Sequence, residues 1–326
     1  MSSIRRILVA VKDPAARVQP AVQKAAQLAA GLGAHLELFH AICEPIFVDA
    51  LALAAKSLEQ LEDEWRDRHL ERLERLAAKL RTDGVGVTTA CDWDYPAFEA
   101  VVRRAQRSRS DLIVAERHAT KHHAPWLLRF NDWELLRRSP VPVLLVKSGR
   151  RWDRPAVLAA VDPGHSFAKP AKLDAAILEA AMAVTEALRG KLHAVHAFVP
   201  SVVDVRTLDL DDPNLSAYIE SQAAQHARGA FERAVAPAGL PPARRHLVGR
   251  HPADAIPQVA RSTKAAIVVM GAVSRSGLKR LLVGDTAERI LDALACDVLV
   301  VKPAHFASRV SARGRGVQLI ASPGVI

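Results

Sequence analysis

The feature that most constrains this chain of 326 residues is an internal repeat that spans roughly half its length. Segments of the first half reappear in the same order in the second: RRILVAVKDP as PAVLAAVDPG, GAHLELFHAI as GKLHAVHAFV, DYPAFEAVVRRAQRSRSDLIV as RHPADAIPQVARSTKAAIVV, and SPVPVLLVKS as ACDVLVVKPA. A repeat of this length is a whole domain, not a solenoid unit. We therefore expect two domains of one fold, residues 1–150 and 151–303, joined near Ser148–Ala156.

Each half contains short apolar runs that are bounded by Gly, Pro or charged residues. In the first half the runs are Ile7–Val11, His35–His40, Val85–Ala90, Leu112–Ala115 and Val143–Val146. In the second half they are Ala156–Val161, Leu192–Ala197, Arg244–Val248, Ala266–Met270 and Val298–Val301. Uninterrupted Val, Ile and Leu runs are typical of strands buried on both faces of a parallel sheet. Helical patterns such as Leu58–Leu80 lie between them, so the sequence predicts an α/β fold of two tandem doubly wound domains, each with a five-stranded, mostly parallel sheet.

Composition narrows the class of protein. Half of the residues are hydrophobic and a quarter are charged, which is an ordinary globular balance. The apolar run Ile7–Val11 is too short for a signal peptide, and no run approaches the roughly 18 residues that span a bilayer, so we expect a cytoplasmic protein with no membrane partner. Cys43, Cys91 and Cys296 have no paired spacing, which favours a reducing compartment.

The formal net charge of +10 permits anionic partners, and part of it lies at the C-terminal end. Residues 304–326 are basic and contain glycine without a clear period, so we expect a disordered basic tail. Arg309, Arg313 and Arg315 lie close together there, but no aromatic residues interleave with them for base stacking. The tail would therefore bind nucleic acid only weakly and in a salt-sensitive way, and a nucleic-acid partner is not favoured.

The loop after the fourth apolar run of the second half carries the strongest ligand signal. In VVMGAVSRSGLKRLLVGDTAERIL an apolar run stops at Gly271, a basic loop follows, and a helical pattern begins after Gly284. A helix N-terminus offers free N–H groups and partial positive charge, which suit a phosphate, and ligands of doubly wound sheets bind at this edge. The loop matches neither the Walker A nor the Rossmann glycine pattern, so a plain connecting loop with a good helix cap remains the alternative.

The repeat, the strand order and this loop together resemble the universal stress protein family, especially its tandem two-domain members, whose fold is similar to that of the adenine nucleotide alpha hydrolases. The resemblance covers nearly the whole chain. The ATP-binding branch of that family carries G-x2-G-x9-G-Ser/Thr after its fourth strand. Gly271 matches the first glycine and Gly284 the last. Ser274 stands at the second glycine, and Asp285 followed by Thr286 stands at the Ser or Thr.

The resemblance also implies a ligand and further residues that contact it. Asp162 would lie near the adenosine, Ala197 beside the adenine, and Met270 on the nucleotide side, while Arg275 adds positive charge to the loop. We therefore expect a stress-response regulatory protein that binds ATP or another adenine nucleotide, with Mg²⁺, in its second domain. Asp285 would compete with phosphate for the helix N–H groups and repel it, so binding should be weak.

Other functions remain open. No Ser-His-Asp order, paired carboxylates or metal-binding motif converges on the loop, so the sequence predicts no dedicated enzyme and no catalytic residue. A slow ATPase and a nucleotide-free scaffold or small-molecule carrier are the alternatives. Single-domain relatives pair through their last strand, so the resemblance implies that the two domains form a pseudo-dimer within one chain, and it leaves a homodimer open.

The first half has lost the glycine pattern. Glu116-Arg117-His118 stands where the second half has Met270-Gly271-Ala272. At the first strand Lys12 falls opposite Asp162, and Asp13 comes one residue late, which points a strand side chain the other way. We expect no ordinary ATP site in residues 1–150.

Several histidines and one cysteine have simpler interpretations. A metal site at His118, His122 and His123 lacks a nearby cysteine, so a solvated basic loop is favoured. His40 and His196 occupy equivalent places in the two second strands, which favours a structural role over ligand contact, and Cys43 is expected to be a packed thiol.

Overall fold

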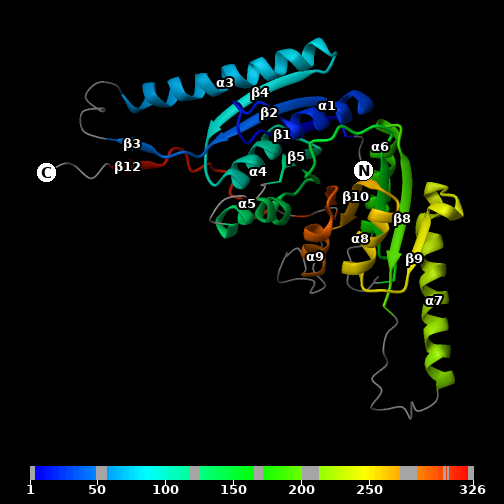
Figure 1. Cartoon of the computed structure of the whole chain (residues 1–326). Coiled ribbons are helices and arrows are strands. Elements are labelled where there is room, and N and C mark those ends of the chain that lie inside the picture. Colours follow the sequence, from blue (N-terminus) through cyan, green and yellow to red (C-terminus); the bar gives the residue numbers. More distant parts are fainter. Residues whose placement is uncertain are drawn as a thin grey trace. The chain divides into compact units, whose positions relative to one another are not determined.

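The computed structural model describes residues 4–48, 57–117, 125–164, 172–199, 213–271, 285–303, 306 and 308–321. The chain divides into two compact units (Figure 1). The first domain consists of Ser2–Arg151 together with His305–Ile326, and the second domain consists of Trp152–Ala304. The C-terminal end of the chain therefore belongs to the first domain.

The first domain is built on a doubly wound parallel sheet. Its sheet strands are β1 (Arg6–Ala10), β2 (His35–Ile42), β4 (Val87–Trp93), β5 (Leu112–Glu116) and β6 (Val143–Val146). They lie in the order β4-β2-β1-β5-β6, and all neighbouring pairs run parallel. The connecting helices are α1 (Pro20–Leu32), α3 (Leu58–Thr82), α4 (Ala97–Arg107) and α5 (Pro125–Arg138). The strand order reverses between β1 and β5, which is where such folds open a crevice.

The second domain repeats this arrangement. Its strands are β7 (Ala156–Val161), β8 (Lys191–Ala197), β9 (Arg245–Val248), β10 (Ala265–Gly271) and β11 (Asp297–Val301). They lie in the order β11-β10-β7-β8-β9, again all parallel. The helices are α6 (Leu173–Ala187), α7 (Pro213–Val235), α8 (Pro252–Ser262) and α9 (Asp285–Ala293), with short 3₁₀ turns at Ala236–Ala238 and Pro242–Arg244. The predicted pair of five-stranded doubly wound domains is confirmed.

Most strands are buried because both faces of each sheet are covered by helices. Val143–Val146 is buried at every position, and so is Asp297–Val301. A strand with helices packed on both faces of its sheet needs apolar side chains on both faces. This explains why these strands are continuous apolar runs and not alternating ones. Among the described helices, none is long and apolar enough to cross a membrane.

Capping residues explain where one helix begins and another ends. Ser57 caps α3 in a reciprocal pair: the Gln60 backbone N–H donates to Ser57 Oγ at 3.3 Å, and the Ser57 N–H donates to Gln60 Oε1 at 3.1 Å. Helix α1 ends at Gly33, whose φ of 64° is left-handed and favours glycine.

The C-terminal segment differs from the sequence prediction. Residues Leu319–Ala321 form a short strand, β12, that pairs in parallel with β3 (Ile46–Val48) of the first domain (Figure 1). The Ile46 N–H also donates to the Gln318 carbonyl oxygen at 2.8 Å. This corrects the expectation of a disordered tail in residues 304–326 for its described part. The partners of the segment lie far away in the sequence, in the first half of the chain. The hydrophobic pattern of the segment alone therefore does not reveal the strand.

Candidate functional site

The parallel strands of the second domain bring four predicted site residues to one edge of the sheet. Strand β7 lies between β8 and β10, and the strand register pairs Val161 with His196 and Ala160 with Met270. Asp162, Ala197 and Gly271 therefore follow at the carboxyl ends of three neighbouring strands. The strand order reverses between β7 and β10, so this edge is the crevice where doubly wound folds bind ligands.

Asp162 is held by its backbone at this edge. Its N–H donates to Asp174 Oδ1 at 3.0 Å, and Asp174 lies in the first turn of α6. Its own side chain is 37% exposed, and its Oδ1 lies 3.9 Å from His196 Nδ1. The Asp162 carboxylate is thus partly accessible on an edge where Ala197 and Met270 are buried.

Two of the predicted contacts belong to the core. Ala197 is 6% exposed and Met270 is 4% exposed. They supply apolar packing at the strand ends, and contact with a ligand at these positions stays a prediction.

Gly271 has a packing role that needs no ligand. A Cβ built at this position would lie 2.8 Å from Leu173 Cδ2 and 3.3 Å from Ile177 Cδ1. Glycine therefore lets helix α6 approach the end of β10 closely. This close approach explains the glycine structurally, whether or not its backbone also faces a phosphate.

The remaining predicted residues lie in or next to the loop that precedes α9. Ser274, Arg275 and Gly284 lie outside the described residues. Helix α9 begins at Asp285, and Thr286 in its first turn is half-buried. The start of α9 follows the carboxyl end of β10 along the chain, and its first N–H groups have no partner within the helix.

The first domain differs at the positions equivalent to this edge. Glu116 pairs with Val146 as Gly271 pairs with Val301, and Ala115 pairs with Ala10 as Met270 pairs with Ala160. Glu116 therefore occupies the place of Gly271. This corrects the sequence alignment, which set Glu116 against Met270, by one residue. A carboxylate in place of the glycine disfavours a phosphate there.

The residues at the end of β1 also depart from the nucleotide pattern. Lys12 is exposed at the position of Asp162. The Asp13 carboxylate accepts the Ala15 N–H at 2.8 Å, so it caps its own loop. That residues 1–150 hold no ordinary ATP site stays a prediction.

His40 and His196 make the same contact in the two domains. His40 Nδ1 lies 2.9 Å from the Val11 carbonyl oxygen, and His196 Nδ1 lies 3.2 Å from the Val161 carbonyl oxygen. Both rings are buried, and burial lowers the pKa of His40, which favours its neutral form. Each histidine ties the end of its strand to the neighbouring one, as the structural role requires, and contact of either ring with a ligand is not tested.

Cys43 is a half-buried, packed thiol. Its Sγ lies 3.1 Å from the Asp94 carbonyl oxygen, and burial raises the pKa of the thiol to about 12. The packed-thiol interpretation is therefore supported. His118, His122 and His123 lie outside the described residues. Within the described ranges, no group of three or more His, Cys, Asp or Glu side chains could hold a metal ion.

Sequence reasoning missed two sets of polar residues. One is Asp174, which fixes the backbone of Asp162; an acidic residue in the first turn of a predicted helix was the available signal. The other is a buried network of Asp94, Glu99 and Arg103 beside the C-terminal segment. The charge difference between the repeat segments DYPAFEAVVR and RHPADAIPQV could have revealed that network.

Comparisons with known proteins agree with this architecture. The sequence model of the Universal stress protein family matches residues 3–147 and 156–302. Universal stress protein E of Escherichia coli strain K12 is 26% identical over 316 residues, which cover 95% of this chain and 98% of that protein. A solved structure from Pseudomonas aeruginosa PAO1, of a protein described as functionally unknown, is 29% identical with a TM-score of 0.69 and covers 92% of this chain and 93% of its own. A universal stress protein from Archaeoglobus fulgidus shares the fold at 16% identity, with a TM-score of 0.58 over 91% of this chain and 97% of its own.

Proposed function

The chain belongs to the universal stress protein family as a tandem two-domain member similar to universal stress protein E, and on this premise we propose that its second domain binds an adenine nucleotide. ATP with Mg²⁺ is the expected ligand, and the protein acts in the stress response as a regulatory nucleotide binder in the cytoplasm. The observation that carries the proposal is the register that brings Asp162 and Gly271 together at the point where the strand order reverses.

The chemistry of this edge suits a nucleoside bearing phosphates. The partly exposed Asp162 carboxylate can accept hydrogen bonds from sugar hydroxyls, and the N–H groups at the start of α9 favour an anion. We expect Asp285, the first residue of that helix, to compete for the same N–H groups, so the affinity should be modest. The first domain, with Glu116 in place of the glycine, takes no nucleotide in this proposal.

Substitution of Asp162 by Ala tests the site against a matched control. We expect Asp162→Ala to weaken Mg·ATP binding about tenfold, because a lost charge-assisted hydrogen bond at a partly exposed position is on that order. Asp13→Ala removes the carboxylate that follows Lys12, the first-domain counterpart of Asp162, and should leave the affinity within about twofold. Displacement of a fluorescent ATP analogue from the intact chain measures both. Equal effects of the two changes, or no effect of either, would show that Asp162 does not contact the nucleotide.

Two further measurements separate the alternatives. Single-turnover assays with radiolabelled ATP distinguish a slow ATPase, which would release phosphate from a stoichiometric complex, from a binder that returns intact ATP. Mass spectrometry of small molecules released from the purified protein distinguishes a nucleotide binder from a carrier of another ligand. Recovery of a non-nucleotide compound in stoichiometric amount would favour the carrier.

A further inference from the structure

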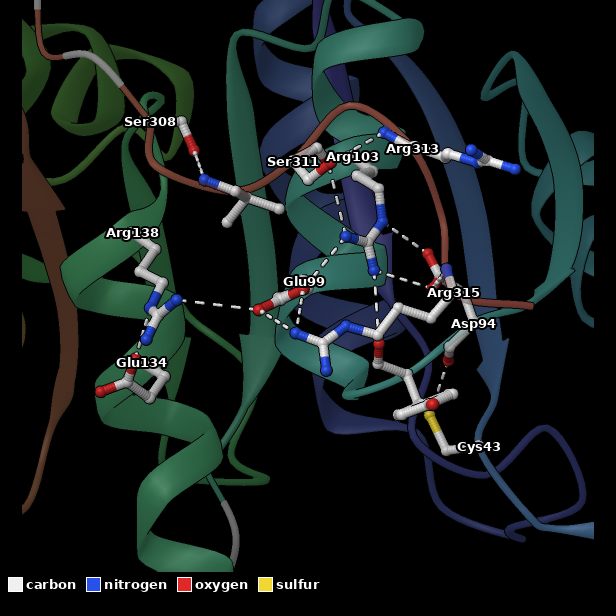
Figure 2. A network of polar contacts seen from close by, with 12 residues as sticks. Cys43, Asp94, Glu99, Arg103, Glu134, Arg138, Ser308, Ser311, Arg313 and Arg315 are labelled. Carbon is white, nitrogen blue, oxygen red and sulfur yellow. Dashed lines mark hydrogen bonds and ion pairs between the residues drawn. The ribbon is translucent and has the colours of Figure 1, made fainter. Parts of the chain in front are cut away.

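The C-terminal segment 308–321, here called the tail segment, lies along the first domain. Its last residues pair with β3, and its middle crosses the end of β4 and the start of α4. Figure 2 shows the segment running beside Asp94, Glu99 and Arg103. We call the face formed by Asp94, Tyr95, Glu99, Arg103 and β3 the tail site.

The tail site contains a buried ion network. The Arg103 side chain is 3% exposed and donates to both oxygens of Asp94, at 2.6 and 2.7 Å, and to Glu99 Oε2 at 3.1 Å. The Asp94 and Glu99 side chains are 7% and 8% exposed. Charges this deeply buried need several hydrogen bonds each to offset their desolvation.

The tail segment supplies part of those bonds. The Arg315 N–H donates to Asp94 Oδ1 at 2.9 Å, and Arg315 Nη2 donates to Glu99 at 3.2 and 3.3 Å. The Arg315 guanidinium also lies 5.5 Å from the centre of the Tyr95 ring. Arg103 Nη1 in turn donates to the Ser311 carbonyl oxygen at 3.4 Å. Both the backbone and one side chain of the segment are therefore recognised.

Close contact restricts the sequence that fits. A Cβ at Gly314 would lie 3.3 Å from Asp94 Oδ2, so a larger residue there would press on the carboxylate. Figure 2 shows the side chain of Arg313 pointing away from the network, unlike that of Arg315. The tail site thus distinguishes two arginines that are two residues apart.

The second domain shows what the same surface is like without a bound segment. Helices α4 and α8 are both eleven residues long, so Asp254 and Gln258 occupy the places of Glu99 and Arg103. Asp254 and Gln258 are exposed, whereas Glu99 and Arg103 are buried.

The charge at the preceding strand end also differs. The strand registers of β4 and β9 place Arg250 where the first domain has Asp94, which reverses the charge. In the second domain this helix face is open to solvent: Asp254 keeps a carboxylate at the place of Glu99, but Gln258 replaces the buried Arg103 and no carboxylate stands at the place of Asp94.

We propose that the tail site is a peptide-binding site of the first domain, and that its ligand is the chain's own tail segment, held through Arg315. In this view the first domain binds an extended arginine-containing peptide at its carboxyl edge. The carboxylates of the site accept hydrogen bonds from backbone N–H and guanidinium groups of the peptide. Gly314 lets the backbone of the tail segment approach Asp94 closely. The proposal does not depend on nucleotide binding in the second domain.

Hydrogen exchange in the intact chain tests the proposal with matched variants. Arg315→Ala removes the side-chain contacts with Glu99 and Tyr95, and Arg313→Ala removes the same charge from a side chain that points away. We expect Arg315→Ala to speed amide exchange in the tail segment and at Ile46 about tenfold or more, and Arg313→Ala to leave both within about twofold. Equal exchange in the two variants, or an unprotected tail segment in the unsubstituted chain, would overturn the proposal.

A peptide added in trans provides a second test on the full chain. A fluorescein-labelled peptide of residues 306–321 should bind the Arg315→Ala chain at least about tenfold more tightly than the Arg313→Ala chain, whose own tail competes at high effective concentration. Fluorescence anisotropy measures both. Equal affinity for the two chains would contradict the proposal. A dimer of the unsubstituted chain that loses tail protection on dilution would also contradict it, because the segment would then occupy a second copy.

Discussion

Arg103→Met is expected to lower the free energy of unfolding of the first domain by about 3–5 kcal/mol. The substitution keeps the volume of the side chain but leaves the Asp94 and Glu99 carboxylates buried without their main cation. The penalty of an uncompensated buried charge is much larger than the net value of the intact pair. Urea-dependent hydrogen exchange of amides in β1, β2 and β4 measures the stability of this domain separately from the second.

Arg107→Met on the same helix is the matched control. Arg107 pairs with Asp92, but the two side chains are 58% and 32% exposed, so the loss should stay below about 1 kcal/mol. If both variants lose the same stability, the buried network does not stabilise the first domain as described.

Gly190→Ala is expected to lower the free energy of unfolding of the second domain by about 3 kcal/mol. A Cβ at this position would lie 2.3 Å from the backbone oxygen of Pro155. That oxygen already accepts the Lys191 N–H at 2.9 Å, and the proline ring fixes the local φ, so the backbone can yield little. The strand register places Ala34 at the equivalent position of the first domain, where Arg5 replaces the proline.

Gly249→Ala provides the control within the same domain. Its Cβ would lie 3.5 Å from the Phe198 ring, an ordinary contact, so the change should stay within about 0.5 kcal/mol. The same exchange experiment, applied to β7, β8 and β10, compares the two variants. A Gly190→Ala chain as stable as Gly249→Ala would mean that the turn before β8 is looser than the distance indicates.

The sheet strands could be predicted because strands buried on both faces appear in the sequence as continuous apolar runs. Val143–Val146 and Ala156–Val161 have the predicted bounds, since strands covered on both faces must be apolar throughout. The other predicted sheet strands differ from the observed ones by at most three residues at either end. The repeat then predicted one topology for both halves, because two copies of one sequence pattern fold alike.

The contacts of the C-terminal segment could not be predicted in this way. Strands β3 and β12 are three residues each, too short to show a period, and each finds its partner far away in the sequence. The equivalence of Glu116 and Gly271 in the two domains was missed for a different reason. The repeat segments differ by one residue in length, so the alignment depends on where the slip is placed, and the pairing of β5 with β1 and β6 fixes that place.

The candidate site was predictable in its placement and not in its detail. The strand ends bearing Asp162 and Gly271 follow from the topology, so the sequence could locate the edge. The close approach of Leu173 to Gly271 depends on how α6 packs, which no local pattern records. Contact between a ligand and Ser274, Arg275, Gly284 or Asp285 stays a prediction.

Titration calorimetry of Mg·ATP into the intact chain tests the central claim most directly, because that claim is that two copies of one fold have diverged in what they bind. We expect one site per chain, which persists in the Asp13→Ala chain and weakens about tenfold in the Asp162→Ala chain. Two equivalent sites per chain, or a single site that Asp13→Ala removes and Asp162→Ala preserves, would contradict the account.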